Sequence, residues 1–263
     1  MDVSFMVLIF LLGAIGSFLS GMLGIGGAIV QYPVLLYLPP LFGFPAFSAH
    51  DVTGMVAVQV FFTSMAGLVV HGKGGSFNQS LAVYMGTAVL AGSFLGGYGS
   101  KWLSETWIHF IYAILATLAV WMMFHSEKET KETAARPIVS HPATVMGITL
   151  VVGVFSGIIG SSGSFILVPV LLFVFKIPTR TAIATSLAIA FVSSAGSVAA
   201  KLVSDQILLL PSMILAISGL IASPAGAMVS KKTNPRTLRV GLTLVIAITF
   251  LKIWYDYLAI YIG

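Results

Sequence analysis

The chain carries very little charge. Only 8% of its 263 residues are Asp, Glu, Lys or Arg, and its mean hydropathy is +1.04. Soluble domains carry about 25% charged residues, so this chain cannot cover a water-facing surface. The deficit is concentrated, because segments 3–49 and 142–175 contain no Asp, Glu, Lys, Arg or His. About 20 apolar residues span a bilayer as a helix. The sequence therefore predicts an all-α polytopic protein of the cell membrane, in a bacterium the inner membrane.

Cysteine is absent, which excludes disulfides, thiol catalysis and a Cys-ligated metal. The formal net charge is +5, but the basic residues lie at segment ends and not along one face, so a nucleic-acid partner is not expected. No His, Asp or Glu cluster has metal-ligand spacing, and no phosphate-binding glycine loop is present. We therefore predict neither an enzyme nor an ATP-driven pump, and no metal or cofactor. The first 16 residues lack a basic start and are predicted to be a retained helix.

Ten apolar segments are predicted to be membrane elements. Two of them, 28–38 and 164–176, are too short to span comfortably at 1.5 Å per residue, and each follows a Gly-rich break, so they are predicted to be half-helices. A mixed-charge linker at 125–141, expected in the cytoplasm, separates a first unit at 1–124 from a second at 142–263. The predicted elements are 3–23, 28–38, 45–70, 79–100, 106–124, 142–159, 164–176, 181–200, 207–229 and 237–259.

The two units repeat one motif. Residues 20–27 read Ser-Gly-Met-Leu-Gly-Ile-Gly-Gly, and residues 156–163 read Ser-Gly-Ile-Ile-Gly-Ser-Ser-Gly. Five residues after each motif comes Pro-Val-Leu-Leu, at 33–36 and at 169–172, so the offset is a constant 136. This predicts an internal duplication. Because five elements per copy is an odd number, the two copies are expected to be inverted repeats, an architecture of transporters.

Lys and Arg residues are unevenly distributed between the two sides. If all ten elements cross, the loops after the even elements hold only Lys101 and Lys201, and Lys252 lies inside the last element. Because basic loops favour the cytoplasm, both termini are predicted to lie outside. The loops after the odd elements hold Lys73, Lys128, Lys131, Arg136, Lys176, Arg180, Lys231, Lys232, Arg236 and Arg239.

The Gly-rich breaks are candidates for an anion site. Glycine lets the backbone approach a ligand closely, and the start of a half-helix presents free N–H groups and a positive dipole end. The alternative is close helix packing, since small residues line membrane helix interfaces. The candidate residues are Gly24, Gly26 and Gly27 in the first break and Gly160, Ser161, Ser162, Gly163 and Ser164 in the second.

Polar residues inside apolar helices are further candidates, because they are costly there without a partner. Gln59, Thr185 and Ser186 are predicted to line the site, against the alternatives of an interhelical bond for Gln59 and bonds to their own helix for the other two. His50 and Asp51 form an adjacent ionisable pair and are weaker candidates for carrying a coupled proton. Solvation at the outer mouth is their alternative role.

The paired Gly motifs, each with its Pro-Val-Leu-Leu, and the run Ala184-Thr185-Ser186-Leu187 resemble the TauE/SafE sulfite-exporter family over nearly the whole chain. One departure is Ser161-Ser162, where a further glycine is commoner. The resemblance implies a secondary transporter that exports a small sulfur-containing anion, such as sulfite, sulfoacetate or a related organosulfonate. The expected partners are that anion, the lipid bilayer, a coupled proton and a second copy of the chain. Transport of another small anion, import, an anion channel and a membrane scaffold are the alternatives.

Overall fold

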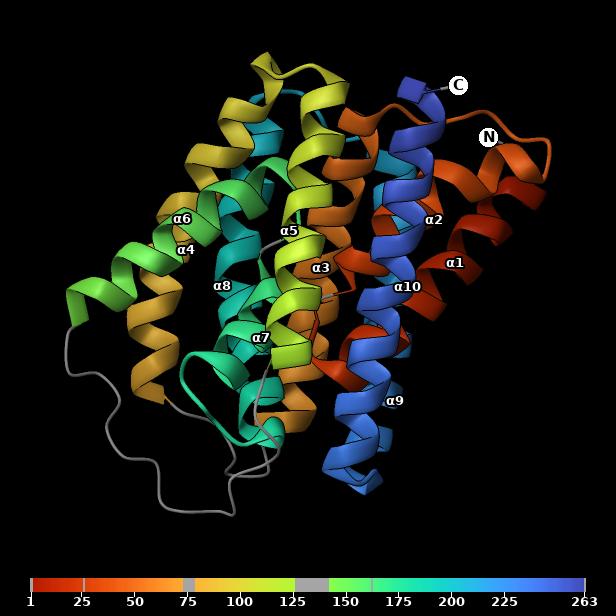
Figure 1. Ribbon diagram of the computed structural model, residues 1–263. Coiled ribbons are helices and arrows are strands. Elements are labelled where there is room, and N and C mark those ends of the chain that lie inside the picture. The colour runs from red at the N-terminus through yellow and green to blue at the C-terminus, as the bar shows by residue number, and fades with distance from the viewer. Residues whose placement is uncertain (1, 26, 73–78, 126–141, 162, 263) are drawn as a thin grey trace.

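The computed structural model describes residues 2–25, 27–72, 79–125, 142–161 and 163–262. Within these ranges the chain forms ten α-helices and one short 3-10 helix, and no strand (Figure 1). Every predicted segment is confirmed as a helix, with bounds shifted by a few residues. The helices are α1 (Val3–Leu23), α2 (Ala28–Leu41), α3 (Ala49–Gly72), α4 (Gln79–Gly99), η1 (Ser100–Trp102), α5 (Glu105–His125), α6 (Pro142–Ile159), α7 (Ser164–Phe173), α8 (Thr179–Val203), α9 (Leu209–Lys232) and α10 (Pro235–Ile262).

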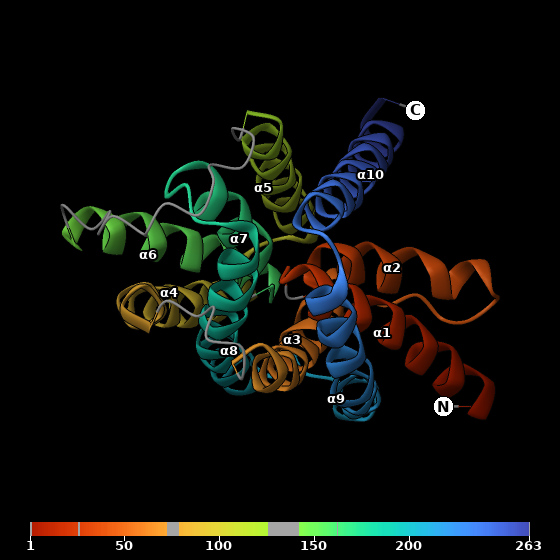
Figure 2. The same ribbon diagram turned by 90° about the horizontal axis from the view of Figure 1, so that it is seen from below.

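Helices α3 and α8 lie side by side at the centre (Figure 2). The ring centroids of Phe61 and Phe191 are 5.0 Å apart, and Lys201 Nζ donates to Thr53 Oγ1 at 2.9 Å. The start of α3 therefore lies beside the end of α8, and the two helices are antiparallel. On one side α4 packs against α6 and α8, and on the other α9 packs against α1 and α3. Helices α5 and α10 contact each other, and they contact α7 and α2, respectively.

The short helices return the chain to the end of the molecule from which it came. Phe5, at the start of α1, stacks on Phe44 and Phe47 after α2, with centroid distances of 4.8 and 5.6 Å. Trp121, near the end of α5, contacts Phe173 at the end of α7 with a centroid distance of 5.5 Å. At 1.5 Å per residue α2 and α7 are only about 21 and 15 Å long. Both are shorter than the roughly 30 Å hydrocarbon core, which agrees with the prediction that they are half-helices.

The short helices leave the distribution of basic residues unchanged, because neither Gly-rich break contains Lys or Arg. One residue in that count was misplaced. Lys201 belongs to α8 and its side chain is fully buried, so it is not a loop residue.

The outer surface of the bundle is apolar along whole helices. Within the described residues, six helices are long and apolar enough to cross a membrane, and large apolar side chains are exposed on them at intervals of about one turn. Such apolar stripes are suited to contact with the lipid of a bilayer. The multi-pass membrane prediction is therefore confirmed. Examples are Val3, Val7, Leu11 and Ile15 of α1 and Val240, Leu244, Ile248, Leu251 and Tyr255 of α10.

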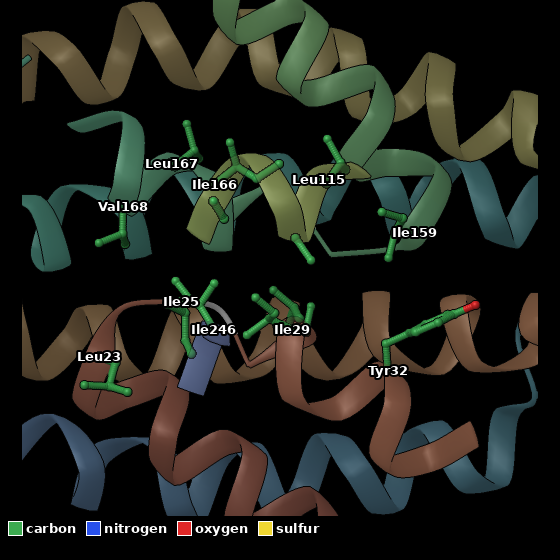
Figure 3. Packing of buried hydrophobic residues seen from close by; sticks show 14 of the residues in the cluster. Leu23, Ile25, Ile29, Tyr32, Leu115, Ile159, Ile166, Leu167, Val168 and Ile246 are labelled. Atoms are coloured by element: carbon green, nitrogen blue, oxygen red, sulfur yellow. The ribbon is translucent and has the colours of Figure 1, made fainter. Parts of the chain in front are cut away.

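Apolar side chains fill the space between the two short helices. Ile25 and Ile29 from the first break and α2 lie opposite Ile166 and Leu167 of α7 (Figure 3). All four are buried members of one hydrophobic cluster. The two short helices therefore share one core.

Helices α4 and α6 approach so closely that only glycine fits at their contact. A Cβ atom added at Gly96 would lie 1.8 Å from the carbonyl oxygen of Val154, and one added at Gly157 would lie 2.3 Å from that of Ser93. Small residues allow this backbone contact, which supplies dispersion energy where lipid offers no hydrophobic driving force.

Helices α1 and α9 make a matching contact. A Cβ atom at Gly21 would lie 2.1 Å from the carbonyl oxygen of Ser223, and one at Gly226 would lie 2.0 Å from that of Phe18. Gly21 and Gly157 are 136 positions apart, and Gly96 and Gly226 are 130 apart. Residues at matching positions of the two units therefore make matching contacts.

We predict that Gly96→Ala lowers the stability of the purified protein by about 1–3 kcal/mol, because the new methyl group forces α4 away from the Val154 carbonyl. Gly99→Ala is the matched control, since no atom lies within 4 Å of its added Cβ. The thermal midpoint in detergent measures the effect. Equal midpoints for the two variants would contradict the packing argument.

Candidate functional site

The first Gly-rich break joins α1 to α2 and packs against α8. Gly24 and Gly27 have φ angles of +73° and +75°, which side-chain-bearing residues rarely adopt. The Gly24 N–H donates to the Ser20 carbonyl at 2.8 Å, and its own carbonyl accepts from Ser186 Oγ at 2.9 Å. A Cβ atom at Gly24 would lie 2.8 Å from Ile183 Cα. The break therefore needs glycine for both conformation and space. Gly26 lies outside the described residues.

The second break joins α6 to α7 and packs against α3. Gly160 and Gly163 have φ angles of +73° and +68°. A Cβ atom at Gly160 would lie 1.9 Å from the Thr53 carbonyl oxygen. Ser161 Oγ donates to the Ser156 carbonyl at 3.3 Å. Ser162 lies outside the described residues, as does the side chain of Ser164, the first residue of α7.

The two breaks do not converge on one point. Gly24 lies against Ile183, near the start of α8, and Gly160 lies against Thr53, whose hydroxyl is bonded by Lys201 near the end of α8. Ile183 and Lys201 are 18 positions apart, which is about 27 Å along a helix. One small anion cannot contact both breaks at once. Ser186 of α8 is buried and bonds the Gly24 carbonyl of the first break, and Thr185 is buried next to it in the same helix.

Gln59 connects the middle of α3 to α1. Its Nε2 donates to the Gly13 carbonyl at 3.1 Å and to Ser17 Oγ at 2.9 Å, while its Oε1 has no partner in the residues that the structure describes. Ser17 Oγ also lies 3.0 Å from Thr63 Oγ1. Gln59 therefore makes the interhelical bond that the sequence analysis gave as the alternative to lining the site. Its Oε1 is still available as an acceptor.

Gln31, which sequence reasoning missed, is the most conspicuous polar group of this region. It lies in the first turn of α2 and is fully buried, yet neither Oε1 nor Nε2 has a partner among the described residues. A Cβ atom at Gly16 would lie 2.0 Å from Gln31 Oε1, so the amide rests on the backbone of α1. The sequence does contain a sign of it, because Gln31 is a polar amide residue four positions after Gly27 in a segment that has no charged residue.

Three polar side chains lie along two successive turns of α1. We call them the polar cluster, and they are Ser20 of α1 itself, Gln31 and Gln59. Ser20 is fully buried next to Gly27, and no described residue is a partner of its Oγ. The polar cluster thus holds four buried polar atoms without partners among residues 2–25, 27–72, 79–125, 142–161 and 163–262. Each such atom costs about 1–3 kcal/mol unless a ligand or water satisfies it. An amide and a hydroxyl beside the start of α2 can donate to an anion.

His50 and Asp51 have structural partners. Asp51 Oδ2 accepts from the backbone N–H of Ser48 at 3.2 Å and from Ser48 Oγ at 2.7 Å, while Ser48 Oγ accepts from the Asp51 N–H at 3.1 Å. This reciprocal pair is a capping box at the start of α3. His50 Nε2 lies 3.1 Å from the Leu103 carbonyl oxygen. The two residues do not bond each other, and their part in proton coupling stays a prediction.

We predict that Ser48→Ala lowers stability by about 1 kcal/mol, because it removes the capping hydroxyl, and that Asp51→Asn lowers it by less, because the amide oxygen can still accept from Ser48. Thermal unfolding of the purified variants measures this loss. In proteoliposomes both variants should keep the pH profile of transport. A profile flattened by Asp51→Asn but not by Ser48→Ala would assign Asp51 to proton coupling.

Comparison with known proteins gives a consistent family. The family model described as Sulfite exporter TauE/SafE matches residues 9–253. The Bacillus subtilis protein named "Probable membrane transporter protein YunE" is 25% identical over 96% of this chain and 98% of its own length. A "Probable membrane transporter protein" of Xylella fastidiosa is 28% identical over 66% of each chain, and one of Methanocaldococcus jannaschii is 23% identical over 92% of each. No solved structure matches the chain.

Proposed function

Because the chain belongs to the sulfite exporter TauE/SafE family of membrane transporters, we propose that it is a secondary transporter exporting a small sulfur-containing anion, such as sulfite, sulfoacetate or a related organosulfonate. The observation that carries the choice of an anion is Gln31, a fully buried amide in the first turn of a helix, for which no described residue is a partner of either amide atom. The polar cluster is the binding site in this proposal.

The chemistry of the polar cluster suits a small oxyanion. Such an ion has several acceptor oxygens, to which the two N–H groups of Gln31 and the hydroxyl of Ser20 can donate. The positive end of the α2 dipole adds electrostatic stabilisation. Because these groups are neutral, binding stays weak enough for release, as transport requires.

The second break supplies a second station in this proposal. Gly160 and Gly163 would admit the anion to the start of α7, where the hydroxyls of Ser161, Ser162 and Ser164 assist. Gly24, Gly26 and Gly27, with Thr185 and Ser186 of α8, would form the wall around the first station. An anion would occupy the two stations in turn, since the breaks are far apart along α8.

We further propose that units 1–124 and 142–263 are inverted repeats that move relative to each other. The matching contacts of α1 with α9 and of α6 with α4 support this, as does the antiparallel pairing of α3 with α8. Each of these interfaces joins the two units, so a shift of one unit would alter access to both stations, as in other transporters with inverted repeats.

The proposed topology predicts that a reporter in the 125–141 linker and one after Gly263 lie on opposite sides of the membrane. The linker and its neighbouring loops carry most of the basic residues and should be cytoplasmic. Accessibility of the two reporters to an impermeant reagent in intact cells measures this. Reporters on the same side would contradict the inverted arrangement.

A flux screen in proteoliposomes with sulfite, sulfate, sulfoacetate and acetate tests the function. We expect saturable uptake of sulfite or sulfoacetate, and dependence on a pH gradient would reveal a coupled proton. Gln31→Leu should weaken the apparent affinity about tenfold or more, because a hydrogen bond to a charged ligand is lost. The same variant should be as stable as the wild type or more stable, because two unpartnered buried atoms disappear.

Ser64→Ala is the matched control for Gln31→Leu. Ser64 is also buried, and its hydroxyl is satisfied by carbonyls of its own helix, at Val60 and Phe61. Transport by this variant should equal that of the wild type. Unchanged affinity in Gln31→Leu would remove the polar cluster as the binding site, and uptake that does not saturate would indicate a channel. Light scattering of the purified protein would test for the second copy.

A further inference from the structure

Lys201 is a lysine enclosed by the protein near the end of α8. Its side chain is fully buried, and Nζ donates to Thr53 Oγ1 at 2.9 Å, to Ser100 Oγ at 3.0 Å and to Gln206 Oε1 at 2.9 Å. These three acceptors come from α3, from η1 and from the connection between α8 and α9. The ammonium group therefore lies where three parts of the chain meet.

All three acceptors are neutral. No carboxylate among the described residues lies within ion-pair distance of Lys201 Nζ, so its positive charge is solvated but not compensated. Burying a charge without a counterion is costly, and replacing it with an apolar residue is often neutral or stabilising. Stability alone therefore does not account for a lysine here.

Gln206 supplies a second donor at the same place. Its Oε1 accepts from Lys201 Nζ and from Ser100 Oγ, while its Nε2 is buried and has no partner within the described part of the chain. Only 9% of Gln206 is exposed. The ammonium group of Lys201 and the unused amide N–H of Gln206 therefore lie close together, because Nζ bonds the oxygen of the same amide. No negative group among the described residues lies between them. This combination is a donor set for an anion.

We propose that Lys201 and Gln206 form a charged anion-binding site for the transported oxyanion. This inference rests on the proposed function for the identity of the anion. The site adjoins the second break, because Thr53, which accepts from Lys201, lies with its carbonyl against Gly160. A bound oxyanion accepts from Gln206 Nε2 and from Lys201 Nζ, where it displaces one of the neutral acceptors. Together with the neutral polar cluster, this gives the anion one uncharged and one charged station.

Binding and flux are measured separately on the same variants. Sodium sulfite and sodium sulfoacetate are each titrated against sodium gluconate at constant ionic strength, and the thermal midpoint of the purified protein gives the apparent Kd. The variants are Lys201→Met, Lys201→Arg and Gln206→Leu. Lys101→Met is the matched control, since Lys101 is an exposed lysine beside Ser100 that lies over the rings of Tyr98 and Trp102. Flux is then recorded in proteoliposomes.

We expect Lys201→Met and Gln206→Leu to weaken the apparent Kd of at least one anion about tenfold or more. Lys201→Arg should retain most of the binding, and Lys101→Met should behave as the wild type. If Lys201→Met lowers the thermal midpoint but binds both anions within twofold of the wild type, Lys201 only clasps the helices and the inference is wrong. Wild-type protein that is stabilised by neither anion also overturns it, even if flux persists. Anion binding that depends on Lys201 without any flux would support this site and refute the proposed function.

Discussion

Contact between helix backbones is the constraint on which this structure depends. Lipid is as apolar as the side chains, so helices in a membrane gain little by hiding Leu or Ile from it, and close packing must hold them together. Here Gly96, Gly157, Gly21 and Gly226 each lie where a Cβ atom would strike a carbonyl oxygen of the facing helix. Each contact joins the first unit of the chain to the second. Neither unit can therefore pack its helices fully without the other.

The same constraint creates the breaks. Helices α1 and α6 turn back at Gly24 and Gly160, where positive φ angles and backbone contacts with α8 and α3 leave no room for a side chain. Packing and function are thus not rival explanations for these glycines. The close contact ends one helix and starts the next, and the start of a helix buried in the protein is where an anion can be held without a fixed charge.

The close glycine contacts of the two units match, but their polar groups do not. Gln31 and Gln59 of the first unit correspond to Leu167 and Ile189 of the second, at offsets of 136 and 130. Lys201 corresponds in the same way to His71, which is also buried and lies 3.1 Å from the Gly21 carbonyl oxygen. Under the proposed function, an anion would meet different chemistry at the two proposed stations. This asymmetry gives the proposed stations their different charge.

The sequence by itself determined the helices, the membrane, the repeated motif and the family, because hydropathy and glycine spacing are local properties of the chain. It also pointed to Gln59, whose isolation in an apolar helix is visible in one dimension. Only the tertiary structure decided that α2 and α7 return, that the breaks lie far apart, that Asp51 caps α3, and that Gln31 and Lys201 are buried. Burial and hydrogen bonding depend on which distant helix faces a side chain. From the sequence alone Lys201 is predicted to be a loop residue. In the structure its side chain is buried against α3 and η1.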